Sequence, residues 1–139
     1  MSNWTHVAAV VRVDDIRIPE LSDGDVDFVS VFGKECRFDS PEEVWDNLHD
    51  HPDQYLPRGS EGTLHMEVWT NPDLSHCDAY TVTIFGDLRD HDSAQEVISW
   101  FKTKLERDPI EGRIRNACIV ANNECYGAQS WSYDEAHDA

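Results

Sequence analysis

Apolar residues recur at every second position in several short stretches of this chain, a spacing that predicts β-strands. Residues 5–14 form a Val-rich run that ends at Asp14 and is followed by a second acidic residue, Asp15, which predicts a buried strand. In residues 63–70, apolar and polar positions alternate, so this strand is predicted to be half-buried, with Trp69 on the face opposite Leu64. Residues 80–85 form the next strand, and the polar turn before them favours an antiparallel hairpin.

Two more strands are predicted near the C-terminus. Residues 113–121 form an apolar β-branched segment, and residues 122–124 are predicted to turn the chain back. The segment 126–133 then returns as an additional strand with Trp131 packed inward. Residues 134–139 are expected to fray as an acidic tail.

Two capping boxes mark the beginnings of helices. Ser40 is followed by Pro41 and, three residues on, by Glu43, which predicts a helix that stops before Pro52. Ser93 and Glu96 form the second box, and apolar residues at helical spacing continue from there as far as Leu105.

The order of these elements predicts an α+β fold of the ferredoxin-like βαββαβ type, an antiparallel sheet with two helices on one face. Residues 1–133 are expected to form a single domain. An acidic insertion at 15–40 precedes the first helix, and residues 26–32 within it fit a short strand. Residues 86–92 are expected to be a polar connector, and the strand at 126–133 is an extra C-terminal strand.

The charge balance narrows the class of protein. The 139 residues include 28 acidic and 11 basic ones, a net charge of −17, yet 40% are hydrophobic. This composition supports a folded core and argues against disorder and against direct nucleic-acid binding, which needs a basic face. No apolar run reaches the ~20 residues that a membrane span requires, and the N-terminus lacks a secretory signal pattern. A cytoplasmic protein is therefore expected.

Four cysteines fit that location. Cys36, Cys77, Cys118 and Cys125 show no paired CxxC spacing and are expected to be reduced and mostly buried. A bridge between Cys118 and Cys125 across a hairpin is the alternative. The seven histidines show no metal-binding spacing, so no metal and no cofactor is expected.

The connector before the second helix is the best place for chemistry. Asp87, Asp90 and His91 combine carboxylates with an imidazole near a helix N-terminus, where anions are favoured. No nucleophile elbow, P-loop or dinucleotide motif accompanies them. We therefore expect no enzyme, and a hydrolase using these three residues is the lesser alternative.

A ligand-binding site is the stronger expectation. Arg58 and Ser60 lie in a Gly-rich loop that lets backbone N–H groups approach a phosphate. Trp69 is predicted on the open sheet face, where an aromatic ring stacks a base or contacts a partner. Arg89 and His91, from the connector, complete the predicted ligand-binding set.

Three stretches, MSNWTHVAAVVRVDDIR (1–17), YLPRGSEGTLHMEVW (55–69) and YTVTIFGDLRD (80–90), together resemble small bacteriophage-encoded proteins. The resemblance implies an antagonist of bacterial immunity in the host cytoplasm. Two binding functions follow from it. One is sequestration of a nucleotide-derived immune signal such as a cyclic nucleotide or an ADP-ribose derivative, with a homo-oligomer enclosing the ligand. The alternative is an acidic, anti-CRISPR-like mimic of DNA that blocks a basic host nuclease or another defence protein through residues 14–53.

Overall fold

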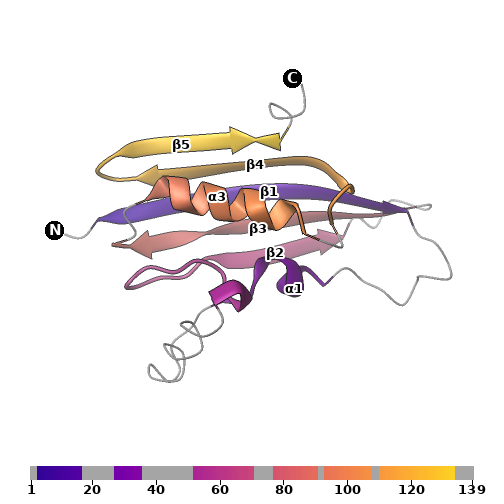
Figure 1. Ribbon diagram of the computed structural model, residues 1–139, viewed down its shortest axis with the longest axis horizontal. Helices are drawn as coiled ribbons and strands as arrows, with labels where there is room; N and C mark the ends of the chain where they lie inside the picture. Colours follow the sequence, from indigo (N-terminus) through magenta and orange to yellow (C-terminus); the bar gives the residue numbers. More distant parts are fainter. Residues whose placement is uncertain are drawn as a thin grey trace.

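The computed structural model describes residues 3–16, 27–35, 52–70, 77–90, 93–107 and 110–133 (Figure 1). These residues include five strands, two α-helices and one short 3-10 helix. In chain order they are β1 (Trp4–Ile16), α1 (Phe28–Phe32), η2 (Pro52–Gln54), β2 (His65–Thr70), β3 (Cys77–Arg89), α3 (Ala94–Leu105), β4 (Ile114–Asn123) and β5 (Gly127–Ser132).

The strands form one sheet in the order β2-β3-β1-β4-β5, and every neighbouring pair is antiparallel. β3 therefore separates β1 from β2, which run in the same direction. The two long strands β1 and β3 pair along all of their 13 residues at the centre of the sheet. These features confirm the α+β class, the antiparallel sheet, the predicted hairpin and the additional C-terminal strand.

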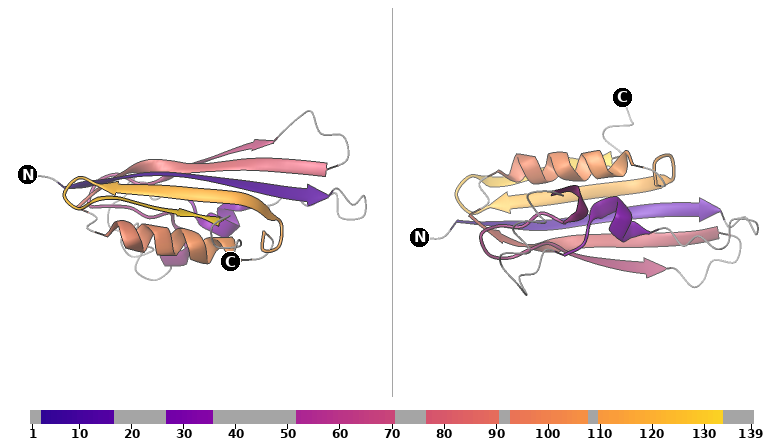
Figure 2. Two further views of the ribbon diagram at one scale, coloured as in Figure 1. Left: turned by 90° about the horizontal axis from the view of Figure 1, so that it is seen from above. Right: turned by 60° about the horizontal axis from the view of Figure 1, so that its bottom comes forward.

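The core lies between the sheet and the helices. Alternate residues of β1, from Val7 to Val13, are buried, and their neighbours Ile84 on β3 and Ile119 on β4 are fully buried. Helices α1 and α3 lie on this same side of the sheet (Figure 2). The period of two along each strand thus sends every second side chain to the opposite side, which no described helix covers.

We call that opposite side the open face. It carries the alternate residues whose side chains point away from the helices. They are His6, Ala8, Val10, Arg12 and Asp14 of β1; His65, Glu67 and Trp69 of β2; Thr81, Thr83, Phe85 and Asp87 of β3; and Asn116, Cys118, Val120 and Asn122 of β4.

Helix α3 begins where its capping box predicts. The Ser93 side chain accepts a hydrogen bond from the Glu96 backbone N–H at 3.1 Å. The apolar stripe of the helix includes Val97 and Phe101, both buried, and Phe101 contacts the Trp131 ring with centroids 6.1 Å apart. Trp131 packs inward from β5, as predicted.

The short strand predicted at 26–32 is wrong, because the structure has helix α1 there. Asp27 caps this helix, since its carboxylate accepts from the Ser30 backbone N–H at 3.2 Å. The spacing of Phe28, Val31 and Phe32 places all three on one buried helical face, an arrangement that a strand does not allow. The helix predicted at 41–51 lies outside the described residues.

The polar connector predicted at 86–92 is also corrected. β3 continues through Arg89, because β1 provides hydrogen-bonding partners along its whole length, down to the pair Trp4 and Arg89. The turn predicted at 122–124 is shifted as well. β4 runs to Asn123, and its side chain accepts from the backbone N–H groups of Cys125 and Tyr126 to form the turn.

Two of the four cysteines can be described. Cys118 and Cys125 are both free and exposed, so the expectation of mostly buried thiols does not hold for them. The register of β4 and β5 places Ser132, rather than Cys125, opposite Cys118.

Candidate functional site

Three of the predicted ligand-binding residues meet at one end of the sheet. The loop containing Arg58 and Ser60 runs beside the end of β3. Ser60 N–H donates to the Arg89 carbonyl at 2.8 Å, and Arg89 N–H donates to the Glu61 carbonyl at 3.0 Å. The loop therefore continues the hydrogen bonding with β3 beyond the beginning of β2.

Glycines make this close contact achievable. A Cβ on Gly59 would lie 2.2 Å from the Arg89 carbonyl oxygen, and one on Gly62 would lie 2.0 Å from the Asp87 carbonyl oxygen. Gly62 also has a φ of +82°, which L side chains rarely adopt. These two glycines are explained by packing against β3, without a ligand.

The charged groups of this loop pair with one another. Arg89 Nη1 lies 2.8 Å from Glu61 Oε1, and the Ser60 hydroxyl donates to Asp90 Oδ2 at 2.9 Å. Arg58 Nε donates to the Gly59 carbonyl at 3.0 Å. The guanidinium of Arg89 thus already has a carboxylate partner, and an added anion would compete with Glu61.

Trp69 lies away from this loop. It pairs with Thr81 on β3, eight residues along the strand from Arg89, a separation of about 26 Å at ~3.3 Å per residue. Its side chain is 55% exposed on the open face, as its alternation with Leu64 predicts. His91, the fifth predicted residue, lies outside the described residues.

Trp69 belongs to a row of residues that crosses the open face. Thr81 is the cross-strand neighbour both of Trp69 and of Arg12 on β1, and Arg12 in turn pairs with Asn116 on β4. These four residues form one row across the open face. Beside the row is a hollow of about 210 Å³, and its lining consists of Val10, Arg12, Thr81, Asn116, Ala117 and Cys118.

Arg12, Thr81 and Asn116 were not among the site residues predicted from the sequence. The alternation along β1 could have placed Arg12 on the exposed face, because Val11 and Val13 on either side of it are buried. Its proximity to Thr81 and Asn116 depends on the pairing of three strands, which no local pattern specifies.

Arg12 is held in position by Asp14. Arg12 Nε donates to Asp14 Oδ1 at 2.8 Å, and Arg115 Nη1 donates to Asp14 Oδ2 at 3.2 Å. Partial burial acts to raise the pKa of Asp14, but the hydrogen bonds from the two guanidinium groups outweigh it and lower that pKa. The carboxylate therefore stays ionised and fixes one edge of the Arg12 guanidinium.

A histidine lies between two carboxylates at the opposite end of β1. His6 Nδ1 is 2.6 Å from Asp87 Oδ1, and His6 Nε2 is 3.5 Å from Glu124 Oε2. The hydrogen bond with Asp87 is the main cause of a raised His6 pKa; partial burial lowers this pKa, and Glu124 raises it further. Asp87, a candidate in the hydrolase alternative, is engaged in this cluster.

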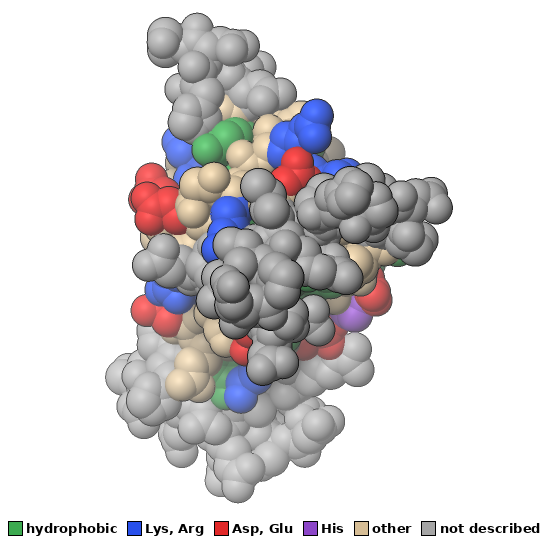
Figure 3. Space-filling view, turned by 90° about the vertical axis from the view of Figure 1, so that its right-hand side faces the viewer, with side chains coloured by type: hydrophobic (Ala, Val, Ile, Leu, Met, Phe, Trp, Pro, Cys, Tyr) green, Lys and Arg blue, Asp and Glu red, His purple; other side chains and the backbone are tan. Residues whose placement is uncertain are grey.

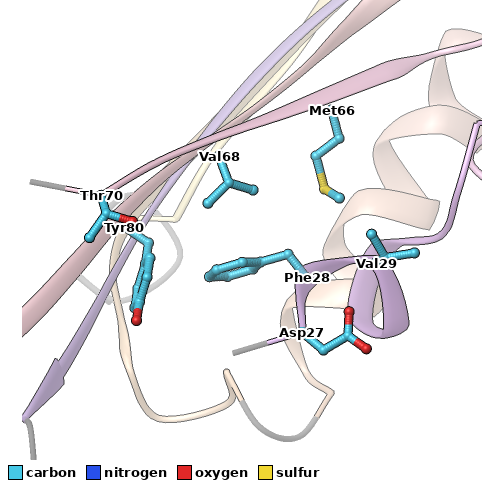
Figure 4. A pocket seen from close by; sticks show the side chains of 7 residues that line it. All are labelled: Asp27, Phe28, Val29, Met66, Val68, Thr70 and Tyr80. Carbon is cyan, nitrogen blue, oxygen red and sulfur yellow. The ribbon is translucent and has the colours of Figure 1, made fainter. Parts of the chain in front are cut away.

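A second hollow, of about 330 Å³, lies on the helix side between α1 and the β2 edge. Phe28, Met66 and Val68 point toward one another across it (Figure 4). The Phe28 ring also contacts the Tyr80 ring edge-on, with centroids 5.3 Å apart. The one charged lining residue, Asp27, is engaged in capping α1, so the hollow offers mainly apolar contact.

The charge of the described residues is modest. They include 14 acidic and nine basic residues, a net charge of −5 out of −17. Figure 3 views the end of the sheet where β1 finishes, and the described acidic and basic side chains there are interspersed. Most of the acidic surface expected over 14–53 lies outside the described residues.

The described residues contain neither a metal-binding cluster nor a membrane-spanning helix. No group of three or more His, Cys, Asp or Glu side chains in this part of the chain is arranged to hold a metal ion. None of its helices has the length and apolar character needed to cross a membrane.

Comparison of the chain with protein-family models, with curated proteins and with solved structures found no match.

Proposed function

We propose that this protein binds and sequesters a nucleotide-derived signal of bacterial anti-phage immunity, without catalysis, in the cytoplasm of the bacterial host. The observation that carries the proposal is the row of Trp69, Thr81 and Arg12 on the open face. An exposed indole provides a stacking surface for a base, and a guanidinium binds phosphate through paired N–H donors. The immune setting is part of the proposal and comes from the resemblance of residues 1–17, 55–69 and 80–90 to phage proteins, which the comparisons neither support nor contradict.

The spacing within the row suits a nucleotide. Two strand spacings of about 4.8 Å separate Trp69 from Arg12, so a base on the indole and a phosphate at the guanidinium are about 10 Å apart. Thr81 lies between them and offers a hydroxyl to the sugar. Asn116, on the far side of Arg12, adds an amide that donates to phosphate oxygens.

Sequestration requires binding alone, and the pairing of nearby carboxylates is in keeping with this. Asp87 is engaged by His6, and Asp90 accepts a hydrogen bond from Ser60. Neither carboxylate lines the hollow beside Thr81. The row of Trp69, Thr81 and Arg12 therefore gives no support to the hydrolase alternative.

We also infer that the core is ferredoxin-like. In that fold a strand lies between two parallel strands joined by a helix, and β3 lies between β1 and β2 in the same way. Helix α3 connects β3 to β4, as the second helix of the motif would. The segment 41–51, outside the described residues, is where the first helix of the motif is expected.

Native mass spectrometry with cyclic oligonucleotides and ADP-ribose derivatives tests the proposed function. The wild-type protein should retain one member of the panel with its mass unchanged. Trp69→Ala should lose that ligand, whereas Tyr126→Ala should keep it, because Tyr126 is an even more exposed aromatic residue that lies in the β4–β5 turn, away from the row. Circular dichroism should show that both variants remain folded.

Other outcomes would overturn the proposal. Retention of the ligand by Trp69→Ala would exclude the row, and recovery of a cleaved nucleotide would show a hydrolase. A protein that binds no member of the panel but captures a basic nuclease, with affinity that falls steeply as salt rises, would be the acidic mimic instead.

A further inference from the structure

The middle of the open face carries a continuous apolar stripe. Val120, Ala8 and Phe85 are cross-strand neighbours on β4, β1 and β3, and Val10 is the next open-face residue of β1. Val10, Phe85 and Val120 are 42%, 44% and 45% exposed. The Phe85 ring also contacts the His65 ring with centroids 5.3 Å apart, which extends the stripe to β2. Exposed apolar area of this kind marks an interaction surface.

Groups of opposite charge lie on either side of the stripe. Toward the end of β1, the guanidinium groups of Arg12 and Arg115 share the single carboxylate of Asp14. Toward its beginning, the carboxylates of Asp87 and Glu124 share the single imidazole of His6. One end of the face is therefore positive and the other negative.

The stripe lies midway between these charged groups. Along β1 the open-face residues are His6, Ala8, Val10 and Arg12, so the apolar pair Ala8 and Val10 is flanked evenly by His6 and Arg12. The centre of this pattern is position 9. Consider a two-fold axis that passes above Ala9, lies in the plane between two facing sheets and is perpendicular to the strands. It places the His6 row of one copy over the Arg12 row of the other, and the Ala8 row over the Val10 row.

We propose that a second copy of this chain packs on the open face about such a two-fold axis. The exposed Arg115 then faces the Asp87 and Glu124 end of the second copy. Ala8, Phe85 and Val120 of one copy lie over the row of the other copy that contains Val10. A two-fold interface requires this self-complementarity, in which each end of one surface matches the other end of its copy. Sheets packed face to face are about 10 Å apart, so side chains of both copies fill the space between.

The size and charge of the face fit this occupant. Four strand spacings and about nine residues of strand length give a face of about 20 by 30 Å, on the scale of the ~800 Å² that each partner contributes to a standard interface. Of the net charge of −17, the carboxylate and guanidinium groups at the stripe and its two ends contribute −2; they are Arg12, Asp14, Glu67, Asp87, Arg115 and Glu124. The repulsion between two chains of −17 thus arises mainly away from the contact.

The dimer goes beyond the proposed function and would complete its site. The second copy closes over the hollow beside Thr81, and symmetry produces two such enclosed sites. Because Asp14 holds one edge of the Arg12 guanidinium, Arg12 stays at the hollow while Arg115 faces the partner. Ligand binding and dimer formation can nevertheless be measured separately, because the dimer is tested without added nucleotide.

Sedimentation equilibrium of the full chain, without added nucleotide, tests the dimer. The wild-type protein should have the mass of two 15.9 kDa chains. Val10→Glu should have the mass of one chain, because it buries an unpaired carboxylate at the centre of the interface. Val29→Glu is the matched control, since Val29 is an equally exposed valine on the helix side of the sheet and its substitution should leave the dimer intact.

A charge-exchange series tests the direction of packing. Arg115→Glu and Glu124→Lys should each weaken the dimer, and the double variant should regain it because the partners attract again with reversed signs. Loss of fold alone would not give this rescue. A wild-type monomer at every concentration, or a dimer that survives Val10→Glu, would overturn the proposal. A wild-type dimer that binds no nucleotide would contradict only the proposed function.

Discussion

Arg12 and Trp69 are both cross-strand neighbours of Thr81, although they belong to β1 and β2. The relationship arises because β3 lies between these two strands and all three have the same side facing away from the helices. It brings a cation and an exposed aromatic ring to the same row of the sheet. The predicted loop residues Arg58, Ser60 and Arg89 lie at one end of the sheet instead.

Substitution of two arginines distinguishes these locations. Arg12→Gln should reduce nucleotide affinity at least about tenfold, because a charge-assisted hydrogen bond to phosphate contributes about 1.5–3 kcal/mol. Arg89→Gln should leave the affinity unchanged, since Arg89 lies eight residues along β3 from Thr81, about 26 Å from the row at ~3.3 Å per residue. Isothermal titration calorimetry with the ligand retained in mass spectrometry gives both values, and the opposite result would return the site to the loop.

A pair of glycine substitutions measures the contact between the loop and β3. Gly62→Ala and Gly112→Ala both place an alanine at a φ near +80°, which costs about 1–2 kcal/mol. Only at Gly62 does the added Cβ meet a backbone oxygen, that of Asp87, whereas nothing lies within 4 Å at Gly112. Urea unfolding should therefore show a further loss of about 1–3 kcal/mol for Gly62→Ala. Equal losses would mean that the loop moves away freely.

The capping of α3 is testable at Ser93. Ser93→Ala removes the acceptor for the Glu96 backbone N–H and should lower the free energy of unfolding by about 1 kcal/mol. Ser99→Ala provides the comparison, because Ser99 is an exposed residue inside the same helix, where alanine is favoured by its propensity. Thermal unfolding of both variants should show a lower midpoint for Ser93→Ala alone.

The pH dependence of stability should report on His6. Since folding raises the pKa of His6, chiefly through Asp87, the protonated imidazole stabilises the folded state. This contribution is complete below the unfolded pKa of about 6.5 and is lost as pH rises through the higher folded-state pKa. The pair is half exposed, so the effect should be within about 0.2–1 kcal/mol.

Unfolding free energies measured between pH 6 and 8 provide the check. The wild-type protein should lose stability across this range, and both His6→Gln and Asp87→Asn should flatten the decline. A variant that keeps the wild-type slope would assign the pH dependence to another group.

Local sequence patterns were enough to predict the features that depend only on residues close together in the chain. The Ser93 capping box predicted the beginning of α3, and the alternation around Leu64 and Trp69 predicted which side of β2 is exposed. The same approach failed at residues 26–32, where Val and Phe fit a strand by composition. Their spacing and the Asp27 cap instead favour the helix α1.

By itself the sequence determined the α+β class, the antiparallel hairpin, the additional C-terminal strand and the exposure of Trp69, because period and capping act within a few residues. Tertiary structure alone decided the rest. The length of β3 depends on hydrogen bonds from the whole of β1, and the neutralisation of Arg89 depends on a loop 28 positions away at Glu61. The row of Arg12, Thr81 and Trp69 exists because three strands pair in one register, and register is set by the shared core rather than by any one strand.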